Sequence, residues 1–399
     1  MFQGMLRSHG DTDPTAMLSE RRRGRVGRTG GKRPPRERSI VLMVPILLAI
    51  GVAGGCAGEP AEGEGLRGGV ITGAGATFIM PLVTLWSYEY EARTGKRVNY
   101  NSIGSGGGIR AHIDRTVDFG ATEAPLNPEQ FRRAEGTLTL PLTIGTVALA
   151  YNLPGVDELR LTGSLLADIY LERVTRWDDP RIQELNPDQN LPDRRIVTVH
   201  RSDGAGTTFI FSDYLSKVSE AWAEVVGVGT SLSWPGGIGG NGNEGVAGAV
   251  RNNPYSIGYI EFSYAMSLNM PTAYMENQEG LFLQPSLEGA TAAAAAVVEE
   301  LPAGHESWHE VSFTNAPGVD SYPLSSFSYY IVYEDLARAG RNMTRRRAVD
   351  MVEWLEWTVT EGQRYNNDVG NAAIPDRVRE LNLESLDRVH FEGEPVRSR

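Results

Sequence analysis

Thr72-Gly73-Ala74-Gly75-Ala76-Thr77-Phe78 is the first of three segments of this chain that share one design. The others are Ser102–Gly108 (SIGSGGG) and Ser202–Thr208 (SDGAGTT). Each surrounds a Ser or Thr with glycines and leads directly into a stretch whose apolar residues recur at helical spacing. A helix start leaves backbone N–H groups unpaired and carries partial positive charge, and a hydroxyl adds a donor. The three segments therefore predict that several helix N-termini converge on one small oxyanion.

Short strands and helices are predicted around the first two segments. Val70–Thr72, Arg97–Asn101 and Val117–Gly120 are expected to be strands, and the apolar spacing over Ile79–Arg93 predicts a helix. Gly145–Tyr151 (GTVALAY) is nearly all apolar, which is typical of a strand buried on both faces. Strands that alternate with helices indicate an α/β fold with mainly parallel sheets.

The same patterns continue beyond the middle of the chain. In chain order they predict a strand over 195–200, a helix carrying the apolar residues of 209–218, a Gly- and Asn-rich loop over 234–245, a strand over 257–262, an exposed helix over 286–300 and a helical region around 345–361.

Two apolar runs, Gly145–Tyr151 and Phe327–Tyr333, are candidates for paired strands that cross between two domains. The chain would leave the first domain, build the second and return. We therefore expect lobe 1 to comprise residues 68–149 and 330–399, and lobe 2 to comprise residues 150–329. A ligand between two such lobes lies in a cleft that can close by hinge motion.

The first 67 residues differ in composition from the rest. Residues 1–55 carry a net charge of +6 and the remainder −18. The basic start, a short apolar run over 40–53 and the small residues before Cys56 describe an export signal. This pattern is similar to a bacterial lipoprotein signal peptide over 1–55, with Cys56 as the lipidated residue and membrane anchor. A plain secretory signal with an incidental cysteine is the alternative. The acidic, apolar-poor residues 56–67 predict a flexible tether.

The net charge of −18 beyond residue 55 argues against nucleic acid as a partner. It does not argue against a small anion, because local backbone dipoles rather than the global charge would bind it. No pattern in the chain calls for a cofactor.

The residues resemble the bacterial phosphate-binding protein of ABC transport. TGAGATF, Trp86 in the following helix, VNYNSIGSGGGI and TVDFGATEAPL are similar to its N-terminal domain. The resemblance continues in order to the C-terminus, through the segments 168–171, 176–179, 201–209, 234–245 and 257–259. It implies a two-lobed periplasmic-binding-protein fold of type II with two hinge strands. Phosphate would bind in the interlobe cleft, in the periplasm or at the outer face of the cytoplasmic membrane, and pass to the permease subunits of an ABC transporter.

The resemblance also implies a set of phosphate-binding residues. Asp203 would hold Arg201, the only cation of the site, by an ion pair. Two positions depart from the family pattern: Glu123 stands where Asp is usual, and Ala205 where Ser is usual. The implied ligands are the Thr77 hydroxyl, the Phe78 backbone N–H, Ser105, Glu123, Arg201, the backbone at Ala205 and Gly206, and Thr207.

Glu123 is the single acceptor among these donors. Phosphate near neutral pH still carries a proton that a carboxylate can accept, whereas sulfate presents only lone pairs and is repelled. Donors alone would hold either anion, so the expected specificity depends on Glu123. Trp86, Trp177 and Trp234 are expected to pack in the interior, because an inorganic anion has no ring to stack against.

Other functions remain open at this point. His305-Glu306-Ser307-Trp308-His309 matches the H-E-x-x-H pattern of zinc hydrolases, which requires a helix and a third ligand. A phosphatase could use an oxyanion site, but no Walker-type motif and no dense Asp/His cluster is present. A binding protein for sulfate or molybdate, or a surface sensor or adhesin that keeps the fold, are further alternatives.

Overall fold

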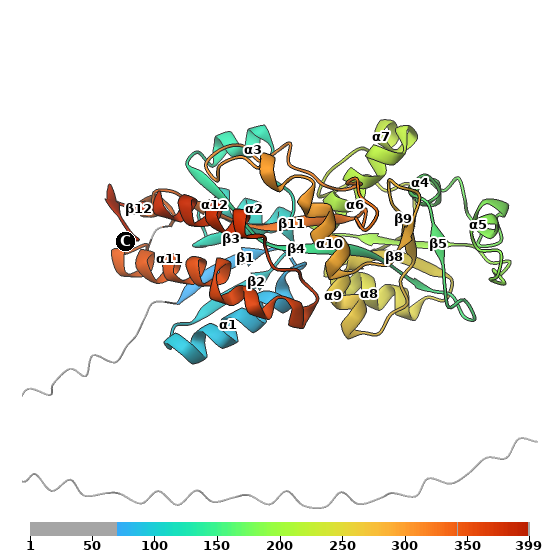
Figure 1. Ribbon diagram of the computed structural model, residues 1–399, viewed down its shortest axis with the longest axis horizontal. Coiled ribbons are helices and arrows are strands. Elements are labelled where there is room, and N and C mark those ends of the chain that lie inside the picture. The colour runs from blue at the N-terminus through green and yellow to red at the C-terminus, as the bar shows by residue number, and fades with distance from the viewer. Residues whose placement is uncertain (1–69, 341, 398–399) are drawn as a thin grey trace, which may run out of the picture. The chain divides into compact units, whose positions relative to one another are not determined.

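The computed structural model describes residues 70–397 except residue 341 (Figure 1). Cys56, the predicted signal peptide and the predicted tether therefore lie outside the described residues. An eight-stranded mixed sheet has the strand order β2-β1-β3-β11-β4-β8-β6-β7. Its strands are β1 (Ile71–Gly75), β2 (Val98–Ser102), β3 (Phe119–Thr122), β4 (Thr137–Asn152), β6 (Val197–Arg201), β7 (Ile238–Gly240), β8 (Ser256–Glu261) and β11 (Ser325–Tyr333).

Helices surround both ends of this sheet. Strands β1, β2 and β3 pack with α1, α2 and α11, which we call the β1 end; strands β6, β7 and β8 pack with α6 and α8, which we call the β6 end. Figure 1 shows the two groups on opposite sides of the central strands. The helices are α1 (Met80–Thr94), α2 (Ser105–Ile113), α3 (Pro128–Arg133), α4 (Gly163–Tyr170), α5 (Pro180–Leu185), α6 (Gly206–Val218), α7 (Glu220–Val225), α8 (Gly242–Asn252), α9 (Phe262–Ser267), α10 (Leu287–Ala295), α11 (Arg345–Val359) and α12 (Asp376–Asp387).

Smaller elements complete the described chain. A three-stranded sheet has the order β10-β9-β5, and β12 pairs with β13. These strands and the 3₁₀ helices are β5 (Arg160–Leu161), β9 (Tyr274–Glu276), β10 (Phe282–Leu283), β12 (His390–Phe391), β13 (Glu394–Pro395), η1 (Val298–Glu300), η2 (Leu336–Arg338), η3 (Glu361–Tyr365) and η4 (Asn367–Val369).

Strand β4 connects the two ends of the sheet. It pairs antiparallel with β11 over Thr137–Thr146 and antiparallel with β8 over Val147–Asn152. The strands that contain the two predicted runs, β4 and β11, pair with each other, but the runs themselves do not: Phe327–Tyr333 pairs with residues 137–144 of β4. Most of the predicted run 145–151 pairs with β8, because β4 begins at Thr137 and its earlier residues face β11. At both ends of the sheet β1 and β6 pair in parallel with their neighbours, as predicted.

A β-bulge interrupts the β4–β11 ladder. Ser328 lies opposite Thr143, but the next residue, Tyr329, lies opposite Pro141. Proline has no N–H to donate to a ladder, so the pairing shifts beside it. The bulge falls at Ser328, whose hydroxyl reaches the candidate site described below.

Each end of the sheet has an aromatic core. Trp86, Tyr90 and Trp354 pack edge to face at the β1 end. Phe211 stacks on Tyr259 at the β6 end, with Trp222 and Trp234 beside them. Trp86 and Trp177 are fully buried and Trp234 packs against the core, so the expectation that they pack in the interior is confirmed.

Two predicted elements are wrong in part. The loop expected over 234–245 contains β7 and the start of α8, because pairing with β6 satisfies the backbone of its glycines. The helix expected over 286–300 ends at Ala295, and it is not simply exposed, since Ala290, Ala293 and Ala294 are buried.

The lobe boundaries stay a prediction. Among the bonds that cross them, the Thr139 N–H, in predicted lobe 1, donates to the carbonyl of Gly304, in predicted lobe 2. Among the described residues, no helix is both long and apolar enough to cross a membrane.

Candidate anion-binding site

All three glycine segments join a strand of the large sheet to a helix, as predicted. The first follows β1 into α1, the second follows β2 into α2, and the third follows β6 into α6. Among the backbone N–H groups at these starts, those of Phe78, Ser105, Gly206 and Thr207 donate no hydrogen bond within the described part of the chain. Unpaired N–H groups of this kind can bind an anion.

Glu123 lies where the second and third helix starts meet. Its carboxylate is 1% exposed, and it accepts hydrogen bonds from Ser105 Oγ at 2.8 Å and Ser328 Oγ at 3.1 Å. A Cβ atom on Gly206 would lie 2.0 Å from Glu123 Oε2 and 2.6 Å from Ser105 Oγ. Only glycine fits the start of α6 at this approach. The structure therefore brings Ser105 and Glu123 from the β1 end against Gly206 from the β6 end.

Burial makes Glu123 a weaker acid than an exposed glutamate. It raises the pKa of Glu123 to about 7, although the hydroxyls of Ser105 and Ser328 and the charge of Arg201 favour the ionised form. Ser105 does not cap α2, since the N-cap is Gly104 and the Ser105 hydroxyl donates to Glu123 instead. The site thus contains a carboxyl group that changes charge near neutral pH.

Arg201 is a buried cation, with 3% of its surface exposed. Its Nε and Nη2 donate to the two carboxylate oxygens of Asp203 at 2.8 and 2.5 Å, and its Nη1 donates to Thr207 Oγ1 at 2.8 Å. The ion pair expected between these residues is present. Burial alone would raise the pKa of Asp203, but its bonds to Arg201 outweigh this and lower it. Asp203 thus fixes the plane of the guanidinium, beside the start of α6.

Ala205 is placed differently from the expectation. Its backbone N–H donates to the carbonyl of Thr230 at 2.8 Å, so this group is already bonded. Its methyl side chain is fully buried. The third segment therefore offers the N–H groups of Gly206 and Thr207 and the Thr207 hydroxyl, but not the N–H of Ala205.

Thr77 contacts the β6 end directly. Its hydroxyl oxygen accepts from Asn243 Nδ2 at 2.9 Å, and its carbonyl accepts from the Tyr264 hydroxyl at 2.8 Å. A second contact between the ends lies nearby, where the Gly106 N–H donates to the Gly204 carbonyl at 3.0 Å. The start of α1 is therefore bonded to α8 and α9, and the start of α2 is bonded to the segment before α6.

Four residues beside the site were not predicted from the sequence. Ser328 lies within an apolar strand, and the antiparallel pairing of β11 with β3, in which Tyr329 lies opposite Thr122, places it next to Glu123. Asn243 lies in a stretch predicted to be a loop. Glu261 ends β8 and Tyr264 lies on α9, and a carboxylate directly after an apolar strand was the one available signal.

Glu261 is a second fully buried acid. Its Oε2 accepts from the N–H and hydroxyl of Ser263, while Oε1 has no partner in the described chain. Burial raises the pKa of Glu261 to about 8, and the charge of Glu123 adds to this effect. Both acids therefore bind protons more tightly in the folded chain than in the unfolded chain.

This predicts that the anion-free protein loses stability as pH rises. A carboxyl group with a raised folded-state pKa stabilises the fold fully below its unfolded value near 4.5, and this contribution is lost as pH rises toward the folded value. We expect the melting temperature to fall between pH 5 and pH 8. Glu261→Gln should flatten the decline, and Glu224→Gln, an exposed control on α7, should not. A wild-type melting temperature that is constant over this range would contradict the prediction.

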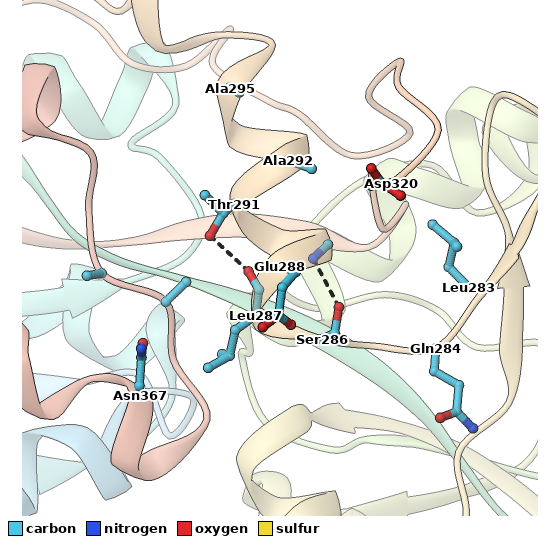
Figure 2. Close-up of a pocket in the computed structure, with 13 residues that line it drawn as sticks. Leu283, Gln284, Ser286, Leu287, Glu288, Thr291, Ala292, Ala295, Asp320 and Asn367 are labelled. Carbon is cyan, nitrogen blue, oxygen red and sulfur yellow. Dashed lines mark hydrogen bonds between the residues drawn. The ribbon is translucent and has the colours of Figure 1, made fainter.

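A cavity of about 910 Å³ lies elsewhere, between α10 and the segment 367–373 (Figure 2). The Thr291 hydroxyl donates to the carbonyl of Leu287, and the Ser286 hydroxyl accepts from the Gly289 N–H, so both hydroxyls are bonded within the helix. The charged residues that line it, Glu288 and Asp320, are both acidic. This cavity is unsuited to an anion and shares no residue with the predicted site.

The zinc hypothesis for 305–309 is wrong. This segment forms turns and irregular structure rather than a helix, and Pro302 and Gly304 precede it. The two histidines thus lack the shared helical face that the motif requires. Within residues 70–397, no group of three His, Cys, Asp or Glu side chains could hold a metal ion.

Comparison with known proteins identifies relatives that cover most of the chain. A model of the PBP superfamily domain matches residues 59–355. The phosphate-binding protein PstS of Xylella fastidiosa (strain Temecula1) is 40% identical over 323 residues, which cover 79% of this chain and 84% of the relative. PstS of Methanocaldococcus jannaschii is 33% identical over 367 residues, which cover 88% and 94%.

Solved structures show the same fold. A high-affinity periplasmic phosphate-binding protein (PfluDING) with bound phosphate aligns with a TM-score of 0.62 and 17% identity, covering 78% of this chain and 92% of that one. Its fold is the two-lobed α/β arrangement expected from the sequence. The chain therefore belongs to the PBP superfamily and, within it, to the family of the phosphate-binding proteins PstS.

Proposed function

We propose that this protein binds inorganic phosphate between the two ends of its sheet and delivers it to the permease of an ABC importer. The observation that carries the proposal is one buried acceptor, Glu123, among hydroxyl, N–H and guanidinium donors at three helix starts. Its relatives are named phosphate-binding proteins, which supports the same ligand. Capture and release require no bond of the ligand to be made or broken, so we propose a binding protein rather than an enzyme.

The proposed ligands are the groups that the geometry leaves able to contact an anion. The N–H groups at the helix starts and the hydroxyls would donate, Arg201 would donate from a guanidinium fixed by Asp203, and Glu123 would accept the phosphate proton. Glu123 now lies against Gly206 and would retract as the anion enters. The donors are Thr77, Phe78, Ser105, Arg201, Gly206 and Thr207, without the Ala205 N–H.

The location follows from the N-terminal sequence. We propose that residues 1–55 are an export signal, that Cys56 carries a lipid and that residues 56–67 tether the domain to the outer face of a membrane. Mass spectrometry of the mature protein from a bacterial host would test this. A lipidated N-terminus at Cys56 supports the anchor, whereas cleavage at another residue contradicts it.

Calorimetric titration of the purified chain with phosphate tests the ligand. We expect a dissociation constant in the micromolar range or below, corresponding to at least about 8 kcal/mol of binding free energy. Binding weaker than about 1 mM would contradict the proposal. Turnover of a chromogenic phosphate ester would instead favour a phosphatase, and equal affinity for sulfate a less selective oxyanion-binding protein.

A further inference from the structure

Thr77 is bonded by two side chains from the opposite end of the sheet. Asn243, in the first turn of α8, donates to its hydroxyl oxygen at 2.9 Å, and Tyr264, on α9, donates to its carbonyl at 2.8 Å. Asn243 is fully buried and Thr77 nearly so. These bonds reach a residue just before the N-terminus of α1, which begins at Met80, far from α8 and α9 in the sequence.

The orientation of the Asn243 amide is determined by a backbone group. The N–H of Glu261 donates to Asn243 Oδ1 at 2.9 Å. A backbone N–H can only donate, so the amide oxygen must face it and the amide nitrogen must face Thr77. The Thr77 hydroxyl therefore acts as an acceptor toward Asn243.

A hydroxyl that accepts one bond keeps its own proton for another partner. Thr77 Oγ1 donates no hydrogen bond within the described residues. Gly75, two residues before Thr77, lies against the backbone of Ala121, where a Cβ would be 2.0 Å from the carbonyl oxygen. The segment is thus closely packed, and the hydroxyl proton of Thr77 is free to donate to another partner.

We propose that Asn243 is a positioning residue of the anion site: it orients the Thr77 hydroxyl as a donor to the bound oxyanion and links the two ends of the sheet around it. The inference rests on the proposed function and deepens it. The order of bonds is Glu261 N–H to Asn243, Asn243 to Thr77, and Thr77 to the anion. Asn243 reaches Thr77 only when the two ends of the sheet are in contact. Contact between the ends and the orientation of the Thr77 hydroxyl therefore depend on the same amide.

Two substitutions of Asn243 separate this role from simple packing. Asn243→Asp keeps the shape but replaces the donor facing Thr77 with an acceptor, so the Thr77 hydroxyl would turn its proton toward the carboxylate and away from the anion. Asn243→Leu removes the donor without adding charge. Both should weaken phosphate binding, the Asp variant more strongly, because it also places a negative charge near the ligand.

A double-mutant cycle with Thr77→Val provides the decisive test. Each Asn243 variant is measured by calorimetric phosphate titration with and without the Thr77 hydroxyl, and melting curves check that all variants are folded. We expect the loss caused by each substitution to be at least about threefold smaller when the hydroxyl is already absent. Asn243→Asp is isosteric, so the cycle does not depend on the Leu variant being folded.

Tyr264→Phe is the matched control. It removes a bond to the Thr77 carbonyl but leaves the hydroxyl and its orientation, so its effect should be the same in both backgrounds. If the Asn243 and Thr77 substitutions couple by less than about threefold, the inference is overturned. Phosphate binding by the wild type would then still support the proposed function. A wild-type protein that does not bind phosphate overturns both.

Discussion

Arg201→Met is expected to reduce phosphate affinity at least about thirtyfold. Arg201 is the buried guanidinium beside the start of α6, and it is held in plane by both oxygens of Asp203. Truncating a buried, hydrogen-bonded charge costs about 2–5 kcal/mol or more, which is roughly 30-fold to several thousandfold in affinity. The variant also leaves Asp203 without its partner, so a negative charge would face the incoming anion.

Arg201→Lys should fall between the wild type and Arg201→Met. Lysine keeps the charge but cannot span Asp203 and Thr207 with one planar group, so it loses the fixed geometry. Arg251→Met, at an exposed position at the end of α8, makes the same change of net charge away from the site and should bind like the wild type. These three variants separate local geometry from overall charge.

The combination Arg201→Met with Asp203→Asn tests whether the Asp203 carboxylate, left without Arg201, repels the anion. Removing the orphaned carboxylate should recover part of the lost affinity, because the repulsion disappears although the donor is still missing. Calorimetry with phosphate, supported by melting curves, measures all four proteins. An Arg201→Met protein that is folded and binds phosphate within threefold of the wild type would exclude Arg201 from the site.

The strand–turn–helix units were predictable from the sequence because their signals are local. Glycines beside Ser105 and Thr207 and the apolar periodicity that follows them define a helix start within about ten residues. The resemblance to a family then ordered these units and suggested their common ligand. What the local pattern could not provide was how the units contact each other.

The residues that the sequence did not reveal depend on pairings between distant segments. Asn243 reaches Thr77 only because β7 joins β6 and places the start of α8 beside the site. Ser328 reaches Glu123 because β11 pairs antiparallel with β3, and the Ala205 N–H is bonded by the carbonyl of Thr230. None of these partners has a composition or spacing that predicts the contact, because register is set by the whole sheet.

Glu123→Gln is expected to reduce the preference for phosphate over sulfate by about ten- to a hundredfold. In the wild type the ionised carboxylate accepts the phosphate proton, whereas sulfate would face the same carboxylate with lone pairs alone. An amide can turn its NH₂ group toward sulfate, which removes a repulsion worth about 1.5–3 kcal/mol in a buried site. Glu123→Asp is the matched control, because it keeps the acceptor and should keep the preference.

The pKa of Glu123 makes the same argument testable by pH. Since burial raises this pKa to about 7, half of the anion-free molecules carry a neutral Glu123 at that pH. The neutral acid can donate to sulfate, so sulfate binding above pH 7 should require the uptake of one proton. The apparent sulfate affinity should therefore fall about tenfold per pH unit above pH 7 and stay level below it.

Calorimetry of sulfate binding in two buffers of different ionisation enthalpy counts this proton directly. At pH 8 the wild type should take up close to one proton per sulfate bound, and Glu123→Gln should take up none. The Gln variant should also bind sulfate equally well at pH 6 and pH 8, because its amide does not titrate. If the wild type binds sulfate at pH 8 without proton uptake, Glu123 does not face the anion, and the basis proposed here for phosphate selectivity fails while the donors at the three helix starts remain.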